Sequence, residues 1–128
     1  MGQQQLLLIV LGTIIVGVAV VVGINMFTTG AINAERDALL QDVNNIASNA
    51  ISYWRKPAAL GGGARTYVGV TLALMGANAS NTNGTFTIST AGTVTQFGLT
   101  ALGASEGVEI IAVIDQNGVV GTPTINMP

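Results

Sequence analysis

The chain has neither cysteine nor histidine, and its charged residues are scarce. Without thiol and imidazole groups it has no cysteine nucleophile, no zinc site of the usual ligand set and no histidine for acid–base catalysis. Charged residues make up 8% of the sequence, whereas ordinary globular domains contain roughly 25%. We therefore do not expect an enzyme, and we predict no catalytic residue, no bound metal and no other cofactor.

Basic residues are scarce as well, which bears on nucleic-acid binding. The four cations, Arg36, Arg55, Lys56 and Arg65, are outnumbered by six acidic residues, and the formal net charge is −2. Proteins that neutralise a phosphate backbone gather more cations than this on one face. We expect no basic patch and predict no contact with nucleic acid.

The sequence does contain a long uncharged apolar run, Leu6 to Ile24, in which Thr13 is the exceptional polar side chain. As a helix rising 1.5 Å per residue, this run spans about 28 Å, close to the hydrocarbon thickness of a bilayer. A membrane anchor is one interpretation. A secretory signal peptide is another, but residues 1–5 lack the Lys or Arg that such peptides carry.

Small residues within the run favour close contact between helices. Thr13 and Gly17 are four residues apart, as are Ala19 and Gly23, and this spacing lets two helices approach closely. We predict that the run packs against copies of itself. The polymerisation residues that we predict within it are Leu6, Leu7, Val10, Ile14, Gly17, Val21 and Gly23.

A second helical pattern follows over residues 31–57, after a weaker stretch at Asn25–Gly30. Arg55 and Lys56 complement the dipole at its end, and Pro57 terminates it. Apolar residues recur at helical spacing and define one face: Ile32, Leu39, Val43, Ile46, Ala47, Ala50, Ile51 and Trp54. An all-apolar helix therefore leads into an amphipathic one, whose apolar face needs a covering layer.

The remaining residues carry the signals of a small antiparallel sheet. Alternating residues on both sides of Ala91-Gly92 predict a hairpin with a tight turn. Asn117-Gly118 predicts a second hairpin, between strands that begin at Val108 and return from Val119 to Ile125. Two hairpins make a four-stranded sheet. Which residues of the strand from Val108 face inward is left open.

The predicted fold class is α+β, with a long N-terminal helix, apolar and then amphipathic, packed on this four-stranded antiparallel sheet. We divide the chain into an apolar polymerisation or transmembrane helix (1–30), an amphipathic helix (31–57) and a β-rich head (58–128). Gly61–Gly63 predicts a flexible crossing from helix to sheet. The predicted core comprises Val43, Ile46, Ala50 and Trp54 of the helix and Phe86, Ile88, Val94, Phe97, Ile110, Ala112 and Ile114 of the sheet.

This arrangement resembles that of type IV pilins. The likeness is closest to the pilin-like proteins that open with Gly-Gln-Gln-Gln-Leu-Leu-Leu-Ile, here Gly2 to Ile9, and continue into an Arg-Asp-Ala helix, here Arg36 to Ala38. Those proteins then have a proline and a glycine-rich linker, here Pro57 and Gly61–Gly63. The likeness in residues covers the N-terminal third, and the likeness in architecture covers the whole chain.

The resemblance implies a processing step and a polymerisation contact. Type IV pilins are made with a short basic leader that a prepilin peptidase removes. In one alignment Gly2 ends a minimal leader and Leu7 is the fifth residue. The alignment that starts the apolar run at the family's place makes Met1 the first mature residue and implies a leader upstream. Gln5 stands where the family has a glutamate that pairs with the N-terminal amine of a neighbouring subunit. A neutral amide makes a weaker hydrogen bond than a carboxylate. We therefore place Met1 and Gln5 at the contact and expect apolar packing to dominate assembly.

The resemblance thus predicts a structural subunit of an extracellular filament at the cell surface. The subunit forms a homopolymer, and its precursor lies in the inner membrane and meets the pilus assembly machinery. Two alternatives are a pseudopilin of a secretion system and a membrane-anchored surface protein with a small binding head. Major pseudopilins often carry calcium in the head, but Glu106, Glu109 and Asp115 match no calcium loop. Asn78 and Asn83 begin N-glycosylation patterns and are possible glycan sites.

Overall fold

The computed structural model describes residues 2–128 and divides the chain into two compact units. We call Met1–Asn33 the N-terminal unit and Ala34–Pro128 the C-terminal unit. The boundaries predicted at residues 30 and 57 remain predictions.

A single helix, α1 (Gly2–Arg55), accounts for the first 54 described residues. It includes Asn25–Gly30, where the residue types predicted a weaker stretch. Extending an existing helix costs far less than starting one, so a few poor helix formers between two long helical segments remain helical. The hydroxyl of Thr29 also donates a hydrogen bond to the carbonyl of Asn25, within the helix.

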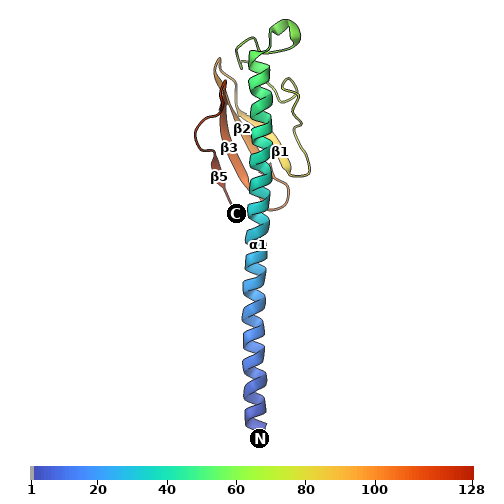
Figure 1. Cartoon of the computed structure of the whole chain (residues 1–128), viewed down its shortest axis with the longest axis vertical. Helices are drawn as coiled ribbons and strands as arrows, with labels where there is room; N and C mark the ends of the chain where they lie inside the picture. The colour runs from blue at the N-terminus through green and yellow to red at the C-terminus, as the bar shows by residue number, and fades with distance from the viewer. Residues whose placement is uncertain (1) are drawn as a thin grey trace. The chain divides into compact units, whose positions relative to one another are not determined.

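The C-terminal unit contains an antiparallel sheet, which lies against the last turns of α1 (Figure 1). In chain order its strands are β1 (Gly84–Thr90), β2 (Gln96–Gly103), β3 (Glu109–Asp115), β4 (Gly118–Val119) and β5 (Thr124–Asn126). β2 lies between β1 and β3, while β4 and β5 both pair with the other edge of β3. The predicted α+β fold, one long helix against a small antiparallel sheet, is confirmed.

The last strand is interrupted, which corrects the prediction of a continuous return from Val119 to Ile125. Gly121 has a φ of 60°, in the left-handed region, and turns the chain out of the ladder. Pro123 has no N–H to donate, so it cannot continue the pairing. β4 and β5 therefore act as two pieces of one fourth strand.

The loop of the first hairpin is longer than the tight turn predicted at Ala91-Gly92. Residues 91–95 join β1 to β2, and Thr93 closes a turn of its own by donating its N–H to the carbonyl of Gln96 at 2.7 Å. The carbonyl of Thr93 accepts the N–H of Tyr67 at 2.9 Å. Val94 consequently lies in an exposed loop, 59% accessible, and its prediction as a core residue is wrong.

The core of the C-terminal unit lies between α1 and the sheet. The buried residues of α1 are Leu39, Val43, Ile46, Ala47, Ala50 and Tyr53. The buried strand residues include Phe86, Phe97, Leu99, Ala101, Ile110, Ala112 and Ile114. The even-numbered residues of β3 therefore face inward, which settles the orientation left open above. Ile88 and Trp54 are only partly buried, and the indole N–H of Trp54 donates to the carbonyl of Val94 at 3.0 Å.

The glycine-rich loop is fixed to the end of α1, which corrects the expectation of a flexible crossing. The N–H groups of residues 63–65 donate to carbonyls in the last turn of α1 and at Lys56, over 2.6–3.0 Å. A Cβ on Gly62 would lie 2.2 Å from the carbonyl oxygen of Lys56, and a Cβ on Gly63 would lie 2.4 Å from that of Thr66. Glycine is needed here because two stretches of backbone approach each other closely.

Candidate assembly surface

The N-terminal unit exposes a continuous apolar surface. From Leu6 to Phe27, every large apolar side chain of α1 is between 49% and 80% accessible. Soluble monomeric proteins rarely expose a contiguous apolar patch of more than a few hundred Å². These side chains are exposed in the described structure, so the surface indicates insertion into lipid or packing against another protein.

The predicted polymerisation residues that the structure describes all lie on this exposed helix. Those spaced by three and four residues follow one side of it: Leu7, Val10, Ile14, Gly17 and Val21. Gln5, Leu6 and Gly23 are exposed on the same helix, whereas Met1 lies outside the described residues. A Cβ on Gly17 or Gly23 would meet nothing within 4 Å. Each glycine therefore leaves a notch at which a neighbouring helix can approach.

The polar side chain within the apolar run forms its hydrogen bond inside the helix. The hydroxyl of Thr13 donates to the carbonyl of Ile9 at 2.8 Å. In hydrocarbon an unsatisfied polar group costs several kcal/mol, so a helix without one is suited to lipid. α1 is long and apolar enough to cross a membrane by length and composition, and none of its most apolar window is buried inside the protein. The surface thus indicates membrane insertion or packing against protein partners.

Glu35 fastens a loop of the C-terminal unit to α1. Its two carboxylate oxygens accept the backbone N–H groups of Ser105 at 2.8 Å and Glu106 at 2.7 Å, in the loop between β2 and β3. Gly103 leaves room for this contact, because a Cβ there would lie 2.3 Å from the carboxylate. Sequence reasoning missed this role, since no spacing rule relates a helical acid to a loop 70 residues away.

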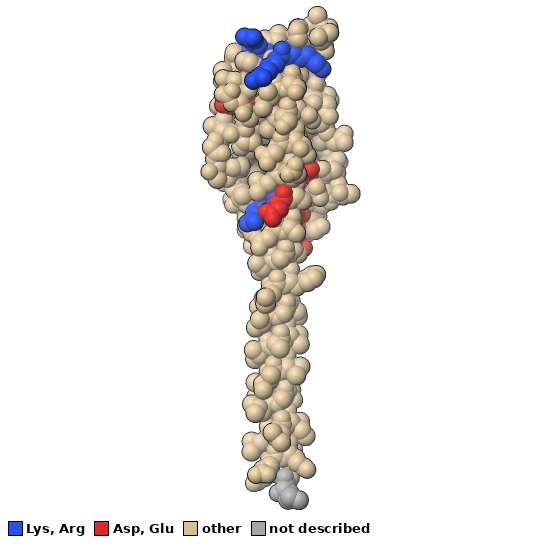
Figure 2. Space-filling model, viewed as in Figure 1, with Lys and Arg blue, Asp and Glu red and all other residues tan. Residues whose placement is uncertain are grey.

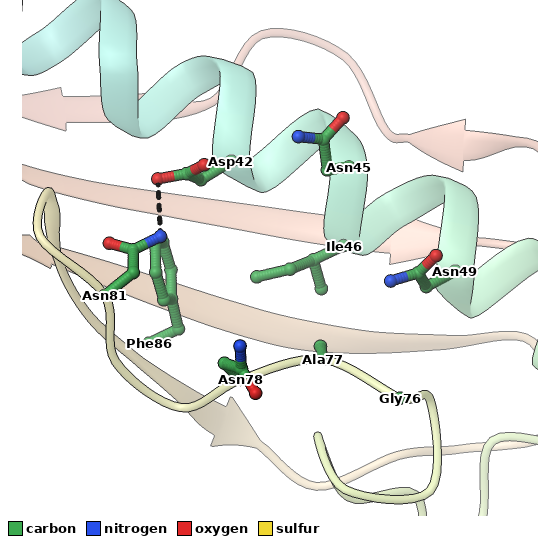
Figure 3. Close-up of a pocket in the computed structure, with 9 residues that line it drawn as sticks. All are labelled: Asp42, Asn45, Ile46, Asn49, Gly76, Ala77, Asn78, Asn81 and Phe86. Atoms are coloured by element: carbon green, nitrogen blue, oxygen red, sulfur yellow. Dashed lines mark hydrogen bonds between the residues drawn. The ribbon is translucent and has the colours of Figure 1, made fainter.

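Asp42 holds the loop before β1 in a similar way. One of its carboxylate oxygens accepts the side-chain amide N–H groups of Asn81 at 3.0 Å and Asn83 at 2.8 Å, and the first contact is drawn in Figure 3. A groove of about 210 Å³ lies beside it, lined by Asp42, Asn45, Ile46, Asn49, Gly76, Ala77, Asn78, Asn81 and Phe86. Ligand pockets usually measure roughly 300–1,000 Å³, and we assign this groove no ligand.

The two possible glycan sites differ in their surroundings. The amide nitrogen of Asn83 is engaged with Asp42 and partly buried. Asn78 is exposed at the groove, and its side chain makes no hydrogen bond to another residue of the described chain. Of the two, Asn78 presents the more accessible amide nitrogen; glycosylation of either remains a prediction.

Most cations and most acidic side chains of the C-terminal unit lie toward different ends of it (Figure 2). Arg55 and Lys56 follow Trp54, and the guanidinium carbon of Arg65 lies 6.0 Å from the centroid of the Trp54 ring. Three of the four cations thus gather at one end of the unit, which corrects the expectation of no basic patch. Toward the other end lie Arg36 and five carboxylates, those of Glu35, Asp37, Asp42, Glu106 and Glu109, while Asp115 lies at the opposite end of β3 from Glu109.

Tyr67 ties the segment between helix and sheet to the core. Its side chain is buried, and its ring packs edge-on against Phe97 with the centroids 5.0 Å apart. Its hydroxyl donates to the backbone carbonyl of Asp115 at 3.1 Å. Burial, and to a smaller degree the negative charge of Asp115, raise the pKa of Tyr67 to about 12. The phenol therefore stays neutral where an exposed tyrosine would ionise.

Together these features define a class of protein. A long N-terminal helix is apolar and exposed in its first part, and its second part packs on a small antiparallel sheet, which is a pilin-like architecture. No family model, curated protein or solved structure matches the chain. The pilin-like class therefore rests on the architecture.

Proposed function

We propose that this chain is the structural subunit of an extracellular filament of the type IV pilus kind, polymerising through its apolar N-terminal helix. The observation that carries the proposal is the exposure of every large apolar side chain from Leu6 to Phe27 on a helix segment without a charged residue. A bundle of parallel copies covers such a surface on all sides, whereas in the single chain the surface is exposed.

The free energy of assembly has two sources in this proposal. In the inner membrane, lipid already surrounds the helix, so association there depends on close packing at notches such as Gly17 and Gly23. Outside the membrane, burying one Leu, Ile or Val side chain is worth about 1.5–3 kcal/mol, and many such side chains hold the bundle together. Gln5 adds a neutral hydrogen bond where the resembling family uses a carboxylate.

The same proposal assigns the protein's partners and location. The subunit is not an enzyme; its main partner is a further copy of itself. A prepilin peptidase and the pilus assembly machinery act on a precursor held in the inner membrane. The finished filament stands on the cell surface, with the C-terminal unit on its outside.

A matched pair of glycine variants tests the polymerisation contact without adding charge. Gly17 lies on the side of α1 that carries the predicted contact residues, and Gly12 does not; both positions have open space around them. We expect Gly17→Leu to reduce the fibres sheared from expressing cells, because it fills the notch, while Gly12→Leu leaves them unchanged. Both variants stay apolar and still enter the membrane.

Val10→Asp is the stronger variant, since it places a carboxylate in the centre of the proposed bundle. We expect it to abolish fibres, with Val10→Ile as the conservative control. Trp54 is the single tryptophan and lies in the C-terminal unit, so its fluorescence in detergent micelles reports whether that unit remains folded. Normal fibres from Val10→Asp would overturn the proposal. Wild-type protein confined to the membrane fraction would favour a pseudopilin or an anchored surface protein.

A further inference from the structure

We infer that the two oppositely charged ends of the C-terminal unit are the two halves of one contact between successive copies in the filament. This inference rests on the proposed function and adds to it a second interface, distinct from the apolar helix. The basic end consists of Arg55, Lys56 and Arg65. The acidic end consists of Glu35, Asp37, Asp42, Glu106 and Glu109, together with Arg36.

The basic end forms no ion pair within the described residues of its own subunit, although Asp115, the sixth acidic residue, lies at the opposite end of β3 from Glu109. Arg55, Lys56 and Arg65 are exposed, and none of them forms an ion pair with any of residues 2–128. The N–H of Arg65 donates to the carbonyl of Trp54 at 2.6 Å, which holds this residue beside the end of α1. In a chain with so few charges, three unpaired cations make a concentrated positive surface.

The acidic end is likewise uncompensated. Glu35 and Asp42 accept hydrogen bonds from neutral donors only, namely backbone N–H groups and asparagine amides, so their negative charges remain. Asp37 pairs with Arg36, and its side chain is 66% accessible. One cation therefore offsets five carboxylates at this end, which leaves a negative surface.

The distance between the ends prevents them from neutralising each other in one subunit. Glu35 and Arg55 lie in the same helix, and their separation of 20 positions corresponds to about 30 Å. The Debye length at physiological salt is only about 8 Å, so attraction across one subunit is screened. A second copy, placed end to end with the first, brings opposite charges into contact.

Such a contact fits a filament in particular. It joins two different surfaces, so it is a heterologous contact. Repeated from copy to copy, it builds an open array, whereas a two-fold contact closes after two copies. C-terminal units stacked in the same direction present the basic end of one copy to the acidic end of the next. An anionic lipid or a nucleic acid would engage the basic end alone and would leave the acidic end without a role.

A charge-swap experiment on the full chain tests this contact. Arg55→Glu with Lys56→Glu makes both ends negative, and Asp37→Lys with Glu106→Lys and Glu109→Lys makes both ends positive. We expect each of these two charge-reversed variants to lower the mass of sheared fibres by about ten-fold, because like charges then face each other. The variant with all five substitutions restores the opposite signs with the polarity reversed, and we expect it to recover most of the wild-type fibre mass.

A control with the same change in net charge distinguishes the loss of a specific contact from a general effect of net charge on assembly. Arg55→Gln with Lys56→Gln and Thr87→Glu with Ser89→Glu change the net charge by the same amount, but Thr87 and Ser89 are exposed on β1 and belong to neither charged end as defined above. We expect the first pair to weaken the fibres, most strongly at low salt, and the second pair to leave them unchanged.

The possible outcomes distinguish a failure of this inference from a failure of the proposed function. If wild-type cells shed no fibres of this chain, the proposed function fails. If fibres form and the two charge-reversed variants form them as well as the wild type does, the proposed function stands and the contact is overturned. Loss of fibres in both charge-reversed variants without recovery in the variant with all five substitutions also overturns it, as does an equal loss with Thr87→Glu and Ser89→Glu.

Discussion

The carboxylate of Glu35 lies 2.7 Å from the backbone nitrogen of Glu106, so an acid in α1 holds a loop that follows it by 71 residues. The donors in this contact are main-chain groups, and the carboxylate therefore fixes the course of the loop independently of its side chains. Asp42, two turns further along α1, fixes the loop before β1 through two asparagine amides. The two acids together anchor one end of the sheet to the helix.

Loss of the Glu35 anchor should destabilise the C-terminal unit. Hydrogen bonds to a charged group are worth about 1.5–3 kcal/mol, so we expect Glu35→Ala to lower the free energy of unfolding by that amount. Urea unfolding of the full chain in detergent micelles, followed by Trp54 fluorescence, measures the change. Asp37→Ala is the control, because an exposed pair such as that with Arg36 contributes at most about 1 kcal/mol. Equal effects of the two substitutions would refute the anchoring role.

The glycine-rich loop should not tolerate a side chain at its centre. Gly62→Ala places a Cβ 2.2 Å from the carbonyl oxygen of Lys56. Because backbone must move to admit it, we expect a loss of about 1–3 kcal/mol in the free energy of unfolding. The control is Gly30→Ala, where nothing lies within 4 Å and alanine favours the helix. A neutral Gly62→Ala would mean that the loop is flexible, as the sequence had led us to expect.

The raised pKa of Tyr67 predicts a loss of stability in alkali. An unfolded tyrosine ionises near pH 10, whereas the folded pKa is about 12. Between these values the folded state binds more protons than the unfolded state, so the free energy of unfolding falls as pH rises from 10 toward 12. Below pH 10 the contribution is fully present. Tyr67→Phe removes the titrating group, and the difference between its unfolding curves and those of the wild type should shrink over this interval; a constant difference would contradict the assignment.

Much of the fold is encoded in local patterns. The apolar period of residues 39–54 identified the buried face of α1, and Asn117-Gly118 indicated the hairpin of β3 and β4, although its two turn residues are Gln116 and Asn117. These features were predictable because helix amphipathicity and two-residue turns depend on neighbours in the chain. The break at Gly121 and Pro123 was missed, although both residue types signal an interruption in a strand.

The features of the candidate assembly surface were likewise predictable only in part from the sequence. The apolar run from Leu6 could be read from composition alone, because no charge interrupts it. The basic end could not, since Arg65 joins Arg55 only when the glycine-rich loop folds back over the helix end. The anchoring roles of Glu35 and Asp42 depend on loops that tertiary structure brings to them, so helical spacing showed these acids only as a polar face.

The most direct test of the central claim is electron microscopy of the material sheared from cells that express this chain. We expect thin, uniform fibres in which this protein is the main component. Cells that shed no such fibres, and that keep the protein entirely in the membrane fraction, would contradict the claim that the exposed apolar helix is an assembly surface.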